Sequence, residues 1–367
     1  VAFAVENAID YCVVAPDDPL VLGCVDALEE KGIPCFGPRA CAAIIEGSKV
    51  FSKNLMKKYG IPTAEYEVFE DMAAALTYLE TAPIPTVIKA DGLALGKGVL
   101  IPQTLEEGKE AVKSIMEDKA FGDSGNEIVI EEFLTGPEVS VLAFTDGTAI
   151  APMVSSMDHK RAGDNDTGLN TGGMGTVAPN PYYTPAVAER CMREIFLPTI
   201  AAMNAEGRTF KGCLYFGLMM TPKGPKVIEY NCRFGDPEAQ VCLSLLKTDL
   251  LTVMNAIIDE KLSEVEIETK DGACVCVMMV SGGYPGSYEK NKLIEGLDEN
   301  GQCEDFYVFH SGTTMKDGKY YTNGGRVLGV TATGDTLKEA LDKAYAAVEK
   351  IGFEGSFYRR DIGWRVL

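Results

Sequence analysis

The sequence predicts a multidomain protein of the α/β and α+β classes, with a doubly wound unit at its start. Its 367 residues suit two to four compact domains. Residues 9–38 follow the order strand, helix, strand, which indicates a βαβ unit. From about Glu268 the pattern changes to short apolar runs between glycine turns, and this change indicates a separate, small C-terminal α+β domain.

Apolar periodicity and turn residues place the elements between these two ends. A helix over 42–60 is predicted to end at Gly60, because Pro62 lies just beyond it. Residues 137–152 indicate a hairpin around Asp146-Gly147. Residues 156–181 are polar and too long for a simple connection, so we expect a functional loop there. Further helices are expected from about Asp71, Thr104 and Thr184 and over 336–352. Strands are expected over 64–70, 127–134, 213–220 and 225–231. Two more strands are expected within 85–102, one on each side of a glycine loop.

Composition narrows the classes of partner. The net charge of −20 argues against a nucleic acid held by a general basic surface. No stretch resembles an uninterrupted membrane span of ~20 apolar residues, and no secretory signal opens the chain. The eleven cysteines are scattered, and Cys274 and Cys276 are best interpreted as reduced core residues, so we expect a cytoplasmic protein. With only His159 and His310, a histidine-rich zinc site is not expected.

The glycine loop within residues 88–99 is the first candidate site. Glycines let backbone N–H groups approach phosphate oxygens, because no Cβ blocks them. The spacing differs from a Walker A loop, and a strand follows where that motif requires a helix. Two interpretations stay open, an ordinary glycine hairpin and a flap that folds over a nucleotide. The flap would involve Lys89, Gly92, Gly96, Lys97 and Gly98.

The second candidate is the hinge that follows the strand over 127–134. Glu131, Glu132, Phe133 and Leu134 precede a break at residues 136–137. Such a hinge can offer backbone groups to an adenine edge, and Glu138 could meet ribose hydroxyls. A solvated pair of glutamates between two domains is the alternative.

The third candidate is the segment "KVIEYNCRFGDPEAQ", residues 226–240. In a strand, alternate residues share a face, so Glu229, Asn231 and Arg233 would project together. Mg²⁺ takes oxygen ligands such as the first two, and Arg233 can fork onto a phosphoryl group. Asp236 could cap the helix that follows, and an exposed helix N-terminus can also hold an anion, so both roles stay open for it.

In chain order, these features resemble the ATP-grasp ligases. The matching features are Lys49, Lys89 with its glycine flap, the hinge, Glu138 and the Glu229–Asn231 pair. Three stretches narrow the resemblance to the glycinamide ribonucleotide synthetase (phosphoribosylamine–glycine ligase) family. They are "RFGDPEAQ", "DHKRAGDNDTGLNTGGMG" and "TNGGRVL". The similarity covers essentially the whole chain.

The resemblance implies an activity, a set of ligands and a division into domains. Family members use ATP to join glycine to 5-phosphoribosylamine through a glycyl phosphate intermediate, a step of purine biosynthesis. They require Mg²⁺ or Mn²⁺. By the same resemblance we expect a monomer that has neither a nucleic-acid nor a membrane partner. The implied domains are a partial N-terminal α/β domain (1–62), an ATP-grasp lid subdomain (63–134), a large ATP-grasp subdomain (135–266) and a C-terminal domain (267–367). The implied site residues are Lys49, Lys89, Gly92, Gly96, Lys97, Gly98, Glu131, Glu132, Phe133, Leu134 and Glu138 for ATP, Glu229 and Asn231 for metal, Arg233, Asp158 and Lys160 for catalysis, and Asp17, Asn170, Thr171, Gly172, Gly173, Met174, Asp236 and Arg326 for substrate.

The sequence departs from the family pattern at three places. The usual opening strand and glycine turn are absent before Val1, so we expect roughly the first fifty residues to be missing, by resemblance to the family. "APDDPL" replaces "GPEAPL", and the shorter Asp17 weakens the expected substrate contact. The strand over 213–220 lacks the second metal carboxylate of other ATP-grasp enzymes. The alternatives are another ATP-grasp ligase, such as a purine-pathway carboxylase or formyltransferase, and a non-catalytic nucleotide-binding regulator.

Overall fold

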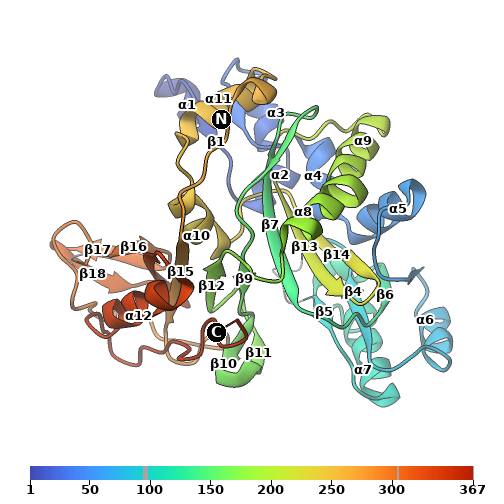
Figure 1. Cartoon of the computed structure of the whole chain (residues 1–367). Coiled ribbons are helices and arrows are strands. Elements are labelled where there is room, and N and C mark those ends of the chain that lie inside the picture. Colours follow the sequence, from blue (N-terminus) through green and yellow to red (C-terminus); the bar gives the residue numbers. More distant parts are fainter. Residues whose placement is uncertain (94–97, 304–305, 367) are drawn as a thin grey trace. The chain divides into compact units, whose positions relative to one another are not determined.

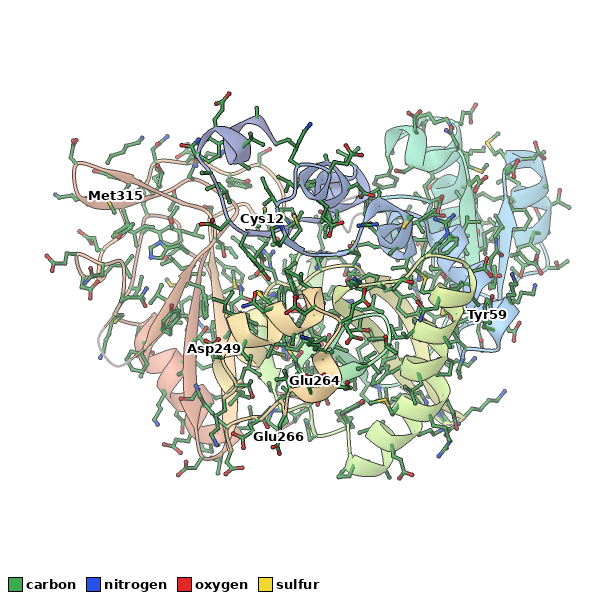
Figure 2. All side chains as sticks on the ribbon, turned by 90° about the horizontal axis from the view of Figure 1, so that it is seen from above. Cys12, Tyr59, Asp249, Glu264, Glu266 and Met315 are labelled. Atoms are coloured by element: carbon green, nitrogen blue, oxygen red, sulfur yellow. The ribbon has the colours of Figure 1, made fainter. Side chains whose placement is uncertain are left out.

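The computed structural model describes residues 1–93, 98–303 and 306–366, and these residues form two compact units (Figure 1). Unit 1 comprises residues 1–152, 184–234 and 249–266, and unit 2 comprises residues 153–183, 235–248 and 267–367. Figure 2 labels Asp249 and Glu266, the two ends of the third segment of unit 1. Each unit is therefore assembled from separate stretches of the chain. The four predicted domains stay a prediction.

Unit 1 begins with short elements in which two predicted helices are broken. The first helix is α1 (Ala2–Glu6), and β1 (Cys12–Val13) pairs in parallel with β2 (Cys35–Phe36). Gly23, with φ +86°, separates α2 (Asp17–Val21) from α3 (Cys24–Glu29). The predicted helix over 42–60 is α4 (Ala40–Gly47) and α5 (Lys49–Tyr59), because Ser48 is extended and its hydroxyl caps α5 by accepting a 2.9 Å bond from the Phe51 N–H.

A small antiparallel sheet in unit 1 carries the glycine loop and one strand of the hinge. Its order is β3 (Tyr66–Phe69), β6 (Ile128–Glu132), β4 (Thr86–Ala90) and β5 (Val99–Leu100). The helices α6 (Met72–Leu79) and α7 (Leu105–Met116) pack on it and begin where predicted, and Asp71 and Thr104 cap them. Buried Ile88, Ile128 and Ile115 fill the core between sheet and helices. The 3₁₀ turn η1 (Gly122–Gly125) precedes β6.

A second antiparallel sheet in unit 1 carries the carboxylate-and-amide segment. Its order is β14 (Gly224–Asn231), β13 (Gly212–Thr221), β7 (Glu138–Thr145) and β8 (Ile150–Pro152), which confirms the predicted strands and hairpin. Phe196 packs on Phe216 with ring centroids 4.4 Å apart, and this contact holds the nearby helical segment against β13. The helical elements of this region are α8 (Pro185–Cys191), the π-helical η3 (Met192–Phe196), α9 (Leu197–Ala205), α11 (Leu250–Ile258) and η4 (Leu262–Glu264).

Unit 2 is built on an antiparallel sheet of five strands. Their order is β16 (Tyr307–His310), β19 (Arg326–Gly334), β15 (Ala273–Val280), β12 (Gly175–Ala178) and β9 (Met157–Asp158). The helices α12 (Leu337–Val348) and α10 (Glu238–Leu245) pack on its strands. Cys274 and Cys276 are fully buried and free, as predicted. Two further hairpins are β10 (Arg161–Gly163) with β11 (Thr167–Asn170), joined by η2 (Asp164–Asp166), and β17 (Thr313–Lys316) with β18 (Lys319–Thr322).

The segment over 156–181 is not the simple loop that we predicted, because much of it is regular structure, and its functional role stays a prediction. The segment contains β9, β10, β11 and β12, and two of these strands belong to the central sheet of unit 2. Buried Ser156, Thr176 and Asn180 show why a polar composition misled the prediction, since these side chains lie inside the fold. Within the part of the chain described, no helix has both the length and the apolar character that crossing a bilayer requires.

Candidate active site

Two lysines share one carboxylate between the helix α5 and the small sheet. Glu131 on β6 lies 2.9 Å from Lys89 Nζ through Oε1 and 3.0 Å from Lys53 Nζ through Oε2. All three side chains are at most 5 % exposed. Lys89 also donates a 3.0 Å hydrogen bond to the Ile228 carbonyl oxygen, next to Glu229. Sequence reasoning found Lys89 and Glu131 and missed Lys53.

Lys49 is the first residue of α5 and reaches the start of the glycine loop. Its ammonium donates a 2.6 Å bond to the Gly92 carbonyl oxygen. Burial lowers the pKa of Lys49 and nearby Lys89 lowers it further, while the charge of Glu229 opposes the shift. Asp91 fixes this end of the loop, because its carboxylate accepts a 2.9 Å bond from the Val50 N–H. The Gly98 carbonyl oxygen accepts from the Ala90 N–H at 2.9 Å, and the predicted Gly96 and Lys97 lie outside the described residues.

The hinge joins β6 of the small sheet to β7 of the larger sheet. Glu132 is exposed and accepts a 3.1 Å bond from Lys226. Burial pushes the pKa of Glu132 upward, but the bonds from Lys226 and the Glu65 N–H and the charges of Lys226 and Lys223 together outweigh it, so the pKa lies below its usual range. Phe133 is 38 % exposed, and Glu138 begins β7. A Cβ at Gly136 would collide with the Met220 carbonyl oxygen, so the tight approach of the hinge to β13 requires glycine.

The end of β14 presents its polar residues on one side, as predicted. Tyr230 and Cys232 are at most 3 % exposed, whereas Glu229, Asn231 and Arg233 are partly exposed. A shift in the β13–β14 register at Gly217 and Leu218 lets both Val227 and Tyr230 be buried. Arg233 lies beyond the last residue of the strand. Among the described residues, no group of three or more His, Cys, Asp or Glu side chains is arranged to hold a metal ion.

A buried carboxylate, Glu46 on α4, holds the segment after β14. It accepts a 2.7 Å bond from the Cys232 N–H and lies 3.4 Å from an Arg233 amino group. Burial raises the pKa of Glu46, and the Arg233 charge opposes this shift. The predicted Asp17 begins α2, and its charge also raises the pKa of Glu46. Glu46 was missed from the sequence, where it resembles any helix glutamate.

In unit 2, Arg326 clamps a glycine loop to the start of α10. Its Nη1 donates to the carbonyl oxygens of Gly172 at 2.9 Å and Asp236 at 2.7 Å, and its Nη2 donates to the Asp236 carboxylate at 2.8 Å. Asp236 also accepts a 2.6 Å bond from Gln240. The predicted capping role of Asp236 is therefore wrong, because Pro237 occupies the cap position and no side chain caps α10.

The remaining predicted residues of unit 2 surround this clamp. Gly173 has φ +116°, and a Cβ on it would collide with Pro237 and the Asp158 carboxylate. Burial raises the pKa of Asp158 well above its usual range and the Glu238 charge adds to this, while Lys160 and Arg326 oppose it. The other predicted positions lie along the same loop: the Thr171 hydroxyl donates to the Lys160 carbonyl oxygen at 2.9 Å, Asn170 ends β11, and Met174 is fully buried.

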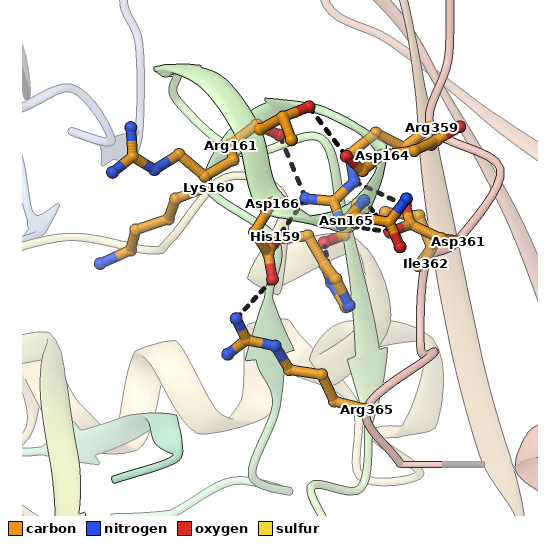
Figure 3. Close-up of polar contacts among 12 residues, drawn as sticks. His159, Lys160, Arg161, Asp164, Asn165, Asp166, Arg359, Asp361, Ile362 and Arg365 are labelled. Atoms are coloured by element: carbon orange, nitrogen blue, oxygen red, sulfur yellow. Dashed lines mark hydrogen bonds and ion pairs between the residues drawn. The ribbon is translucent and has the colours of Figure 1, made fainter. Parts of the chain in front are cut away.

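A buried arginine ties the C-terminal segment of unit 2 to the β10–β11 hairpin (Figure 3). Arg359 has no exposed side-chain surface and pairs with both oxygens of Asp361 at 2.8 Å and with Asp166 at 2.9 Å. The opposite oxygen of Asp166 pairs with Arg365. His159 lies beside this network, between the predicted Asp158 and Lys160 in sequence.

The His159 ring is held in one neutral form. Burial lowers its pKa to about 4. A ring protonated on Nδ1 satisfies both of its contacts, a 3.0 Å bond to the Gly175 carbonyl oxygen and a 3.0 Å bond accepted by Nε2 from the Gly363 N–H. These two hydrogen bonds fix His159 and thereby the backbone between the predicted Asp158 and Lys160. Neither His159 nor Arg359 was predicted as a site residue.

Comparison with solved structures identifies the fold. The biotin carboxylase domain of the Hydrogenobacter thermophilus 2-oxoglutarate carboxylase, solved with MgADP and bicarbonate, superposes with a TM-score of 0.76 at 16 % identity, over 97 % of this chain and 77 % of that one. Residues 47–239 match the family model described as "Phosphoribosylglycinamide synthetase, ATP-grasp (A) domain". The solved structure shows the fold, and the family model assigns the chain to the ATP-grasp ligases, an ATP-dependent enzyme class.

The family follows from the rest of the chain. Residues 1–46 match the N domain and residues 274–365 the C domain of phosphoribosylglycinamide synthetase. The chain is 48 % identical to the phosphoribosylamine–glycine ligase of Vibrio vulnificus, over 100 % of this chain and 86 % of that protein. The corresponding ligase of Caldanaerobacter subterraneus is 47 % identical over 98 % and 86 %. The crystal structure of the ligase from Thermotoga maritima superposes with a TM-score of 0.84 at 39 % identity, over 92 % and 84 %. The chain belongs to the phosphoribosylglycinamide synthetase family.

Proposed function

We propose that this chain joins glycine to 5-phosphoribosylamine with ATP and releases glycinamide ribonucleotide, ADP and phosphate. The names of its relatives support this activity, which belongs to purine biosynthesis. The observation that carries the proposal is the cationic cluster of unit 1. Lys49 and Lys89 lie beside the Glu229 end of β14, where Asn231 and Arg233 also project.

The proposed route has two steps. A glycine carboxylate oxygen attacks the γ-phosphorus of ATP, the bond to the leaving ADP oxygen breaks, and glycyl phosphate forms. The amine of phosphoribosylamine then attacks the glycyl carbonyl carbon, the carbon–oxygen bond to phosphate breaks, and the amine loses a proton. Phosphoryl transfer of this kind depends on positioning and charge neutralisation more than on a protein nucleophile. Lysines and arginine are suited to that role.

Glu229 and Asn231 are the residues that we assign to a divalent cation. Their oxygens share one side of β14, and oxygen ligands from one or two side chains plus phosphates are what Mg²⁺ usually takes. The cation would neutralise charge on the phosphates. The protein's own contribution is to hold Lys49 and Lys89 near this edge, where they bind and orient the phosphate chain.

Glu131 fits the adenine end of the nucleotide. Its Oε1 is buried and, among the described residues, accepts no hydrogen bond, because the Lys89 contact is an ion pair without hydrogen-bond alignment. An adenine amino group could donate to this oxygen, and the backbone of Glu132 to Leu134 would meet the ring edge. In unit 2 we assign Asp158, Lys160 and the Gly172–Gly173 loop to glycine and the amine substrate. Arg326 would act there by holding the loop.

An isotope experiment tests the route and the substrate together. Glycine carrying ¹⁸O in its carboxylate is incubated with ATP, phosphoribosylamine and the protein. One labelled oxygen is expected in the inorganic phosphate, because the carboxylate oxygen leaves with the phosphoryl group. Unlabelled phosphate would overturn the acyl-phosphate route. ADP release with bicarbonate or formate in place of glycine would support a different ATP-grasp ligase.

A further inference from the structure

One buried carboxylate is matched by two buried ammonium groups in unit 1. Lys53 is 2 % exposed and Glu131 4 % exposed, and Lys89 meets the second oxygen of the same carboxylate. Two positive charges and one negative charge leave this group with a net charge of +1. Burying an unbalanced charge is costly, so such a surplus in a folded protein requires an explanation.

Lys53 is fixed by contacts that leave it little freedom. Besides Glu131, it donates a 2.8 Å bond to the Thr63 hydroxyl and a 3.4 Å bond to the Ala64 carbonyl oxygen. Thr63 in turn donates to the Val227 carbonyl oxygen at 2.7 Å, on β14. The same strand supplies the Ile228 carbonyl oxygen that holds Lys89. Lys53 therefore connects α5, β6 and β14, the elements that carry the cationic cluster.

We propose that Lys53 is a positioning residue for nucleotide binding, which neutralises Glu131 so that the charge of Lys89 stays available to the phosphates of a nucleotide. The inference rests on the proposed function, in which Lys89 contacts those phosphates. Without the Lys53 charge, Glu131 and Lys89 would form a closed one-to-one ion pair. An anionic ligand would then have to compete with Glu131 for Lys89. With Lys53 in place, the surplus positive charge is balanced when the phosphates bind.

The surroundings of Lys53 give the inference a pH signature. Burial lowers the pKa of Lys53 to about 8, Glu131 opposes the shift, and the charges of Lys89 and Lys226 add to it. Tyr66 also faces it, with the ring centroid 5.5 Å from Nζ, and burial raises the pKa of that phenol. Lys53 is charged below its pKa and neutral above it. Nucleotide affinity should therefore fall as the pH rises through about 8.

The test measures binding of Mg·AMP-PNP to the full chain by calorimetry, without glycine or amine. In Lys53→Gln the dissociation constant should rise about tenfold at pH 7. Lys57→Gln is the matched control, because Lys57 is exposed one turn along α5 and lies 5.4 Å from the same Tyr66 ring. The control should bind as the parent does. Thermal melting checks that each variant is folded.

A second variant decides the outcome if Lys53→Gln does not fold. Arginine stays charged at every pH used. The nucleotide affinity of Lys53→Arg should therefore fall less between pH 7 and 9 than the affinity of the parent does. The fall that remains is due to Lys49, whose pKa is also lowered. The parental pH dependence in Lys53→Arg, or parental affinity in folded Lys53→Gln, would overturn the inference. Nucleotide binding with no ligation activity would instead remove the proposed function and leave the role of Lys53 standing.

Discussion

At the scale of single residues, Glu229 owes its position to an irregularity in its own strand. A perfect alternation would put Glu229 on the same face as buried Val227, inside the sheet packing. The register shift at Gly217 and Leu218 of β13 separates them, so that Glu229 and Asn231 share the opposite side from Tyr230. Tyr230 itself is held from the other side by a 2.9 Å hydrogen bond with Thr199.

The first residue-scale prediction is that Glu229→Gln will fold normally and turn over far more slowly. Glutamine keeps the shape but removes the charge that would oppose a divalent cation, and loss of several kcal/mol of electrostatic stabilisation lowers kcat by ~100-fold or more. Glu229 is only partly buried, so the melting temperature of the variant should differ little from that of the parent protein. Steady-state kinetics over a Mg²⁺ titration measure the effect. Glu67→Gln, at an exposed position of β3, is the control, and parental kcat in Glu229→Gln would disprove the metal assignment.

The residue scale also shows where the sequence is informative. The alternation of Glu229 and Asn231 within β14 is local, and local spacing predicted it, whereas Arg233 lies beyond the end of the strand. Lys53 lies four residues after Lys49 on α5, and nothing nearby distinguishes it from an exposed lysine. Its burial depends on Glu131, which lies in a strand far along the chain. Charges buried by distant partners cannot be predicted from spacing.

At the scale of elements, one buried cation organises a hairpin and a tail. Arg359 donates to Asp361 in its own segment, to Asp166 at the end of η2, and to the Arg161 carbonyl oxygen of β10 at 3.2 Å. The Asn165 N–H also donates to Asp361 at 2.7 Å. The carboxylates of Asp166 and Asp361 thus offset the free-energy cost of burying the Arg359 guanidinium charge. A polar segment that sequence analysis treated as a loop becomes a fixed element through these partners.

Removing this cation should destabilise unit 2. Arg359→Gln leaves the carboxylates of Asp166 and Asp361 without their buried partner, and such a loss costs about 3–5 kcal/mol. The melting temperature should drop, and amide hydrogen exchange should rise across residues 159–175. Arg360→Gln is a closely matched control, since the neighbouring arginine is exposed and only its backbone N–H meets Asp164. Equal melting temperatures for the two variants would remove the anchoring role of Arg359.

The predicted helix boundaries are wrong where the conformation of a single backbone position outweighs the apolar periodicity. The helix predicted within the βαβ unit of residues 9–38 and the helix predicted over 42–60 keep their apolar spacing, yet the left-handed Gly23 and the extended Ser48 break them. Gly60, in contrast, ends α5 with φ +68°, as the sequence indicated. A glycine after a helix, such as Gly60, is a strong local signal for the helix end. Whether a serine such as Ser48 lies inside a helix or caps the next one depends on what that next helix contacts.

At the scale of the whole molecule, the residues that we assign to the nucleotide and those that we assign to the amine substrate fall in different units. The lysine–carboxylate cluster belongs entirely to unit 1, and the Arg326 clamp belongs entirely to unit 2. Each unit draws on segments that are separated in sequence. Reading along the chain cannot reveal this interleaving, because it depends on which apolar strands bury one another. The motifs of "RFGDPEAQ" illustrate it, since Arg233 lies in unit 1 and Asp236 in unit 2.

This division predicts a selective effect for Arg326→Ala. The substitution removes the donors that hold Gly172 and the Asp236 carboxylate, so the loop assigned to the amine substrate loses its fixed position. The KM for phosphoribosylamine should rise about tenfold, equivalent to ~1.4 kcal/mol, while the KM for ATP stays nearly unchanged, because the nucleotide groups are in unit 1. Lys338→Ala is the control, with a side chain 73 % exposed on α12. Steady-state kinetics with each substrate varied in turn measure both constants. A parental KM for phosphoribosylamine would exclude Arg326 from acceptor binding, and an equal rise in both constants would contradict the division of roles.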